Sequence, residues 1–177
     1  MNIIEFEKLI IQEFKKIIEL IIKDYPELKI SAKSRAGAEI SDFLEEMFVR
    51  YTANNSFFSK CEKSPKGATK NPWDAKTTIC YRDLNEDIWI DFKALKTSGK
   101  DSNPDIGTPN KIIDFILEGH FYLLYIYVFY EETLKGLKFV KSDNEFVKLY
   151  FLKDIHHSFR RNPKNQLQVN MAELPEY

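Results

Sequence analysis

An aspartate and a lysine, Asp91 and Lys93, stand two positions apart in a run of β-branched and aromatic residues at positions 88–92. Residues of these types favour a pleated, buried strand. Because successive side chains of a strand point to opposite faces, we expect Asp91 and Lys93 on the same face. A further acid, Asp74, lies upstream, where another strand is expected to begin. These three side chains are the candidates for a catalytic centre.

Two carboxylates and one ammonium group that converge on one point can hold a divalent cation and an anionic substrate. A hard cation such as Mg²⁺ prefers oxygen ligands and keeps several of its waters. One of those waters could attack phosphorus, while the metal stabilises the charge that develops on the phosphate and leaving oxygens. This combination favours hydrolysis of a phosphodiester.

Helical periodicity predicts two helices in the N-terminal part of the chain. Apolar residues recur at helical spacing over residues 3–24, and Pro26 is expected to end this helix. A second helix is predicted over residues 35–51, with Ser34 as its N-cap. On this second helix, Glu39 falls at the edge of the apolar stripe.

The following segments predict a sheet. Residues 77–81 and 88–95 are expected to form an antiparallel hairpin, because strand-forming residues flank a polar turn. The nearly unbroken apolar run at 121–129 predicts a strand that is buried on both faces. Two more strands are predicted at 137–140 and 146–152, whereas residues 52–72 are expected to form a loop with, at most, a short strand near Phe57 and Phe58.

One more helix is predicted from the residues at its boundaries. Thr108 is expected as its N-cap, Pro109 in its first position and Gly119 directly after its end. The elements together predict an α/β fold with a central mixed β-sheet flanked by α-helices. A length of 177 residues, 44% of them hydrophobic, is typical of one domain, so we expect a single domain over residues 1–177.

The order and the residues of these segments resemble the PD-(D/E)XK nuclease superfamily and, within it, the type II restriction endonucleases. Pro72-Trp73-Asp74 stands where that superfamily has Pro-Asp, and Asp91-Phe92-Lys93 matches its second half-motif. Trp73 is an insertion into the first half-motif. The helix that carries Glu39, the hairpin, the next helix and the buried strand, about residues 34–130, resemble the catalytic core, with residues 137–177 as C-terminal strands and a basic DNA-contact segment.

The resemblance implies a role for each residue. Asp74 and Asp91 are expected to be metal ligands, with the backbone carbonyl of Phe92 as a third ligand. Lys93 would orient or deprotonate the attacking water, or neutralise phosphate charge. Glu39 would accept a hydrogen bond from a metal-bound water or join a second metal site. The expected cofactor is Mg²⁺, which Mn²⁺ can replace. Cleaving both strands of a palindrome requires two active sites, which favours a homodimer.

The expected partner is double-stranded DNA, although the formal net charge is only −1. Positive charge must therefore be local. Lys and Arg neutralise phosphates without reading sequence, whereas Asn, Gln and Arg can pair with base edges in the major groove. The residues predicted to contact DNA are Lys66, Lys70, Lys96, Lys100, Asn103, His156, Arg160, Arg161, Lys164, Asn165, Gln166 and Gln168.

The sequence also indicates a compartment. No apolar run is long enough to span a bilayer, and the first residues lack the pattern of a signal peptide. The two cysteines, Cys61 and Cys80, have no metal-ligand spacing and are typical of free thiols in a reducing compartment. We therefore expect a cytoplasmic protein without a membrane partner.

Simpler interpretations stay open beside these. Asp91 and Lys93 can be an ordinary charged pair at the end of a strand, Asp74 a turn former after proline, and Glu39 a solvated helix residue. The basic clusters can be solvated loops. For function, the alternatives are a DNA repair or junction-resolving nuclease of the same fold and a non-catalytic DNA-binding module. A plasmid-cleavage assay with and without Mg²⁺ separates an enzyme from a binding module.

Overall fold

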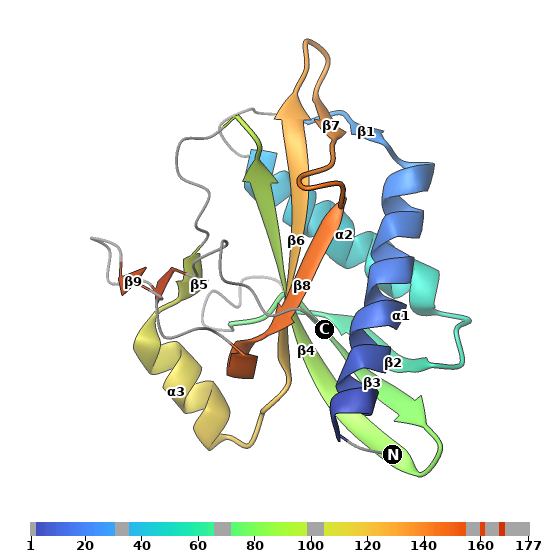
Figure 1. Cartoon of the computed structure of the whole chain (residues 1–177), viewed down its shortest axis with the longest axis vertical. Coiled ribbons are helices and arrows are strands. Elements are labelled where there is room, and N and C mark those ends of the chain that lie inside the picture. The colour runs from blue at the N-terminus through green and yellow to red at the C-terminus, as the bar shows by residue number, and fades with distance from the viewer. Residues whose placement is uncertain are drawn as a thin grey trace.

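A central β-sheet organises the computed structural model, which describes residues 3–30, 36–65, 72–98, 105–154, 160–161 and 167–168 (Figure 1). The elements in chain order are α1 (Ile3–Asp24), β1 (Glu27–Leu28), α2 (Ala36–Thr52), β2 (Phe58–Lys63), β3 (Ala75–Tyr81), β4 (Leu84–Lys96), β5 (Asp105–Gly107), α3 (Pro109–Leu117), β6 (Leu123–Glu132), β7 (Leu137–Phe139), β8 (Val147–Phe151), a 3₁₀ turn (Leu152–Asp154), β9 (Arg160–Arg161) and β10 (Leu167–Gln168).

The sheet is mixed, as predicted. Its strand order is β1-β7-β6-β4-β3-β2, with β8 also paired to β6. β3 and β4 form the predicted antiparallel hairpin, whereas β4 and β6 are parallel and are joined through α3. β5, β9 and β10 form a separate small sheet. This arrangement confirms an α/β fold of the restriction endonuclease type.

The two faces of β4 serve two separate cores. Ile88, Ile90 and Phe92 belong to the larger core, which also contains the buried residues of α1 and α2. Trp89 faces the other way and belongs to a smaller core that includes Phe115 of α3. Since side chains alternate along a strand, Asp91 and Lys93 share the α3 face of the sheet with Trp89.

The predicted helices are present, with small shifts at their ends. The periodic apolar residues of α1 and α2 are buried against the sheet, which is why hydrophobic spacing located both helices. α3 begins at Pro109 as expected, but the Thr108 side chain makes no capping hydrogen bond. Gly119 follows the helix with φ of +90°, a conformation that favours glycine. Ser34, the expected N-cap of α2, lies outside the described residues.

The segment expected to be mainly loop, residues 52–72, contains a six-residue strand, β2. The expected short strand at Phe57 and Phe58 is therefore longer and begins at Phe58. The ring of Phe58 packs edge-on against Phe14 of α1 and Phe48 of α2, which draws this polar strand onto the edge of the sheet. In the part of the chain that the structure describes, no helix is both long and apolar enough to cross a membrane.

Candidate active site

Asp91 and Lys93 form an ion pair on β4. The Lys93 Nζ atom lies 2.8 Å from Asp91 Oδ1 and 2.7 Å from Oδ2, so the lysine bridges both carboxylate oxygens. The Asp91 side chain is only 8% exposed, whereas that of Lys93 is 28% exposed. The pair is therefore not a solvated surface pair, and Lys93 is the member that can reach an incoming substrate.

Asp74 lies directly before β3 and against the edge of β4. Its backbone N–H donates to the Ile90 carbonyl over 2.7 Å, and its Oδ2 atom accepts a hydrogen bond of 2.8 Å from the Phe92 N–H. The carboxyl groups of Asp74 and Asp91 are close enough for Asp74 to raise the pKa of Asp91. The structure thus brings together the two acids that are 17 positions apart in the sequence.

The environment of Asp91 opposes its negative charge. The pKa of this carboxyl is raised to about 7, mainly by burial and also by the neighbouring charge of Asp74, against the opposite effect of Lys93. A divalent cation between the two carboxylates would remove their mutual repulsion. The donor set is therefore suited to a hard cation such as Mg²⁺, which binds through one or two carboxylates and its own waters.

The backbone at Phe92 supplies a further oxygen donor. Among the described residues, no three His, Cys, Asp or Glu side chains are placed to hold a metal by themselves. A metal at Asp74 and Asp91 therefore needs another protein oxygen or more water. Phe92 directly follows Asp91 in the chain, and its N–H donates to Asp74. Its carbonyl accepts a hydrogen bond of 3.0 Å from Ser41 Oγ of α2.

Helix α2 also presents acids toward this edge, and Glu45 is the one that interacts with Asp74. At about 100° per residue, Glu45 lies about 40° around the helix from Ser41, whereas Glu39 lies about 160° away. Burial raises the pKa of Glu45 to about 7, with further contributions from Asp74 and Asp42 and an opposing one from Lys63. Sequence analysis selected Glu39 and overlooked Glu45, although both belong to the same helix.

Tyrosines line the sheet behind the ion pair. Tyr125 and Tyr127 of β6 lie beside Asp91 and Lys93 in the parallel register, and Tyr150 of β8 stacks on both rings. The Tyr125 hydroxyl donates to the Ile106 carbonyl over 2.9 Å, while the hydroxyls of Tyr127 and Tyr150 bond to each other. All three tyrosines are buried, and Tyr125 is the residue of β6 in register with Asp91.

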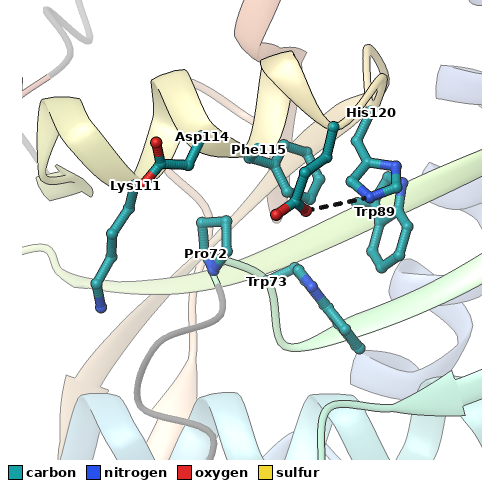
Figure 2. A pocket seen from close by; sticks show the side chains of 8 residues that line it. Pro72, Trp73, Trp89, Lys111, Asp114, Phe115 and His120 are labelled. Carbon is teal, nitrogen blue, oxygen red and sulfur yellow. Dashed lines mark ion pairs between the residues drawn. The ribbon is translucent and has the colours of Figure 1, made fainter.

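A cavity of about 540 Å³ lies between α3, Trp89 of β4 and the residues before β3 (Figure 2). Trp89 lies two residues before Asp91 on the same face of β4. Pro72 and Trp73 lie on one side of the cavity and α3 on the other. Trp73, the insertion into the first half-motif, is one of these lining residues. The remaining lining residues are Lys111, Asp114, Phe115, Glu118 and His120.

The predicted DNA-contacting residues are spread along the chain, and the structure describes only some of them. The Lys96 Nζ atom pairs with Glu132 Oε1 at 2.9 Å. Arg160 and Arg161 form β9, which pairs with β10, and the side chain of Gln168 on β10 is half-buried. The other candidates lie outside the described residues, namely Lys66, Lys70, Lys100, Asn103, His156, Lys164, Asn165 and Gln166.

The sheet is mixed and flanked by helices, and Asp74 lies against the edge of a strand that carries Asp-X-Lys. These features define a nuclease with a restriction endonuclease-like core, consistent with the PD-(D/E)XK superfamily. The family model described as SwaI-like, SwaI restriction endonuclease, matches residues 2–177. The chain belongs to this family of restriction endonucleases and is accordingly a DNA-binding protein. No curated protein matches it.

Proposed function

We propose that this restriction endonuclease is a Mg²⁺-dependent type II enzyme, a single nuclease domain that cleaves double-stranded DNA at a specific sequence. One observation carries the proposal. The Asp74 carboxylate accepts a hydrogen bond from the Phe92 N–H and therefore lies beside Asp91, whose partner is Lys93. This arrangement supports the metal-and-lysine chemistry that the motif implies, and it argues against three unrelated surface charges.

Each residue has a distinct task in this proposal. Asp74, Asp91 and the Phe92 carbonyl would hold the cation. Lys93, as an ammonium group, would orient the attacking water or neutralise charge on the scissile phosphate. A bound Mg²⁺ supplies Lewis-acid stabilisation of the negative charge on the phosphate and the leaving oxygen. Lys93 is partly exposed and stays hydrogen-bonded to Asp91, so its ammonium group is held in place for a phosphate that approaches from solvent.

A digestion experiment tests the activity and its specificity. Plasmid DNA is incubated with the protein in Mg²⁺, in Mn²⁺ and in EDTA. We expect discrete fragments with either metal and intact plasmid in EDTA. A smear would indicate a nuclease without site specificity, cleavage confined to branched DNA would indicate a junction-resolving enzyme, and binding without cleavage would indicate a non-catalytic module.

The same proposal includes a homodimer. One active site cuts one strand, so a symmetric enzyme that cuts both strands of a palindrome needs two copies. Light scattering of the protein with and without a cognate duplex measures the assembly. Linear product that forms without accumulation of nicked circles would support two sites acting together, and a monomer on DNA would contradict the proposed dimer.

Two glutamates of α2 can be compared directly, because both are proposed candidates for supporting the metal site. The interaction of Glu45 with Asp74 favours Glu45, and Glu39 lies about 160° around the helix from Ser41. We expect Glu45→Gln to lower the cleavage rate by about 10–100-fold, the usual effect of losing an outer partner of a metal site. Glu39→Gln is the matched control, expected to stay near the wild-type rate. A larger loss of Mg²⁺-dependent cleavage in Glu39→Gln than in Glu45→Gln would favour Glu39 as the residue that supports the metal site.

Recognition of DNA is proposed to involve the segment around β9 and β10. Arg160 and Arg161 form β9, and each is changed to alanine separately. If one of these arginines is bidentate to guanine, its replacement by alanine should cost ~1–3 kcal/mol of discrimination at one base pair. A phosphate contact should instead weaken binding evenly and lower the salt slope by about 1. Affinities for cognate and scrambled duplexes at several salt concentrations distinguish a base contact from a phosphate contact. Unchanged affinity for both variants would mean that other residues recognise the DNA.

A further inference from the structure

In the part of the chain that the structure describes, no strand pairs with Phe92 on the β3 side of β4. Trp89 donates its N–H to the Tyr122 carbonyl on the β6 side, and alternate residues of a strand point their backbone groups the same way. Phe92 lies three positions after Trp89, so its N–H and C=O point the opposite way, toward β3. However, β3 begins only at Ala75, which pairs with Ile90. At Phe92, side chains replace the missing strand, because Asp74 accepts from the N–H and Ser41 donates to the C=O.

Ser41 is held at this place by the packing of its helix. Its neighbours Ile40 and Leu44 are fully buried in the larger core, and the ring of Phe48 contacts that of Phe92, with 6.2 Å between the ring centroids. Side chains on α2 therefore have little freedom to move relative to β4. The hydroxyl of Ser41 lies 3.0 Å from the Phe92 oxygen as a result of this packing.

We propose that Ser41 is a positioning residue for the metal site, an inference that rests on the proposed function. A carbonyl oxygen has two lone pairs. The Ser41 hydroxyl takes one of them and so fixes the direction of the other, which leaves a defined oxygen donor beside Asp74 and Asp91. Hydrogen bonds of this kind orient metal ligands, and their loss weakens metal binding. Ser41 itself touches neither metal nor DNA in this proposal.

Four variants separate the hydroxyl from the space it occupies. Ser41→Ala removes the hydroxyl. Ser41→Thr and Ser41→Val have the same shape, but only threonine keeps the hydrogen-bond donor, so their difference reports the hydroxyl alone. Ser59→Ala is the matched control, because Ser59 Oγ makes a similar hydrogen bond of 3.1 Å to the Thr78 carbonyl on β3, away from the acids.

The main readout is metal binding rather than activity. Mn²⁺ is titrated into each full-length protein without DNA, and free Mn²⁺ is measured by electron paramagnetic resonance. We expect the alanine and valine variants to bind Mn²⁺ about 10–100-fold more weakly. The threonine variant and Ser59→Ala should bind like the wild type. In cleavage assays, the alanine variant should need more Mg²⁺ but approach the wild-type rate at saturation, a split that a general loss of folding would not produce.

Two results would overturn the role of Ser41. One is wild-type Mn²⁺ affinity in both Ser41→Ala and Ser41→Val. The other is equal weakening in the threonine and valine variants, which would mean that space and not the hydroxyl matters. Asp74→Asn in the same titration tests the proposed function separately. If this variant binds Mn²⁺ like the wild type, the metal site itself is misassigned, and the proposal for Ser41 fails with it.

Discussion

Asp91→Asn is expected to remove DNA cleavage and to leave a folded protein. The change keeps the shape of the side chain but removes its negative charge, which in our proposal binds the metal. Removing one electrostatic group from an active site lowers the rate by about 10²–10³-fold, and we expect at least the upper end of this range for a metal ligand. Cleavage of plasmid DNA in excess Mg²⁺, followed over hours, measures the loss.

The control for Asp91 lies on the same strand. Asp87 accepts a hydrogen bond of 2.6 Å from Thr78 in an exposed position, so Asp87→Asn should retain the wild-type rate. Thermal unfolding in EDTA shows whether Asp91→Asn is folded. Its melting temperature should equal or exceed that of the wild type, because burial and Asp74 both disfavour the Asp91 carboxylate. Full activity of Asp91→Asn in Mg²⁺ would refute its assignment as a ligand.

Lys93→Ala is expected to lower the cleavage rate by about 10²–10³-fold, which corresponds to about 2.7–4 kcal/mol of transition-state stabilisation. The ammonium group lies between Asp91 and the solvent, where the phosphate must approach. Affinity for DNA should fall far less, since one phosphate contact among many contributes little to binding. Single-turnover cleavage and equilibrium binding to the same duplex, the latter in EDTA, measure the two effects separately.

Lys15→Ala is the matched control for Lys93. Lys15 is similarly exposed and pairs with Glu145 at 2.5 Å, but it lies on α1, which packs on the opposite face of the sheet. Both its cleavage and its binding should stay unchanged. If binding and cleavage fell in equal proportion in Lys93→Ala, this lysine would be an ordinary phosphate contact rather than a catalytic residue.

Much of the fold could be predicted because its signals are local. The spacing of apolar residues located α1 and α2, the polar turn between two apolar segments indicated the hairpin, and Pro109 and Gly119 marked α3. The strand buried on both faces, β6, was evident from its unbroken apolar run. β2 was underestimated because its residues are mostly polar. Its place in the sheet depends on pairing with β3 and on contacts of Phe58 with rings from α1 and α2.

The candidate site was predictable only in part. The spacing of Asp91 and Lys93 determines that they share a face of β4, because alternation along a strand is a local property. Choosing between Glu39 and Glu45 was beyond the same reasoning. Both are acids on one predicted helix, and the decision depends on how that helix is rotated against the sheet. Ser41 carried no signal, because serine is common in helices and its partner, the Phe92 carbonyl, is backbone.

Local features of the chain predicted the secondary structure around the motif, the placement of Asp91 and Lys93 on one face of β4 and the family resemblance. The packing of the whole chain was needed to place the start of β3 after Asp74, so that the edge of β4 at Phe92 meets side chains. It also decided which face of α2 meets that edge. The physical reason is the distance along the chain over which each kind of interaction acts. Strand alternation and helical periodicity act between residues a few positions apart, whereas the position of α2 against β4 depends on the packing of a core whose members come from the whole chain.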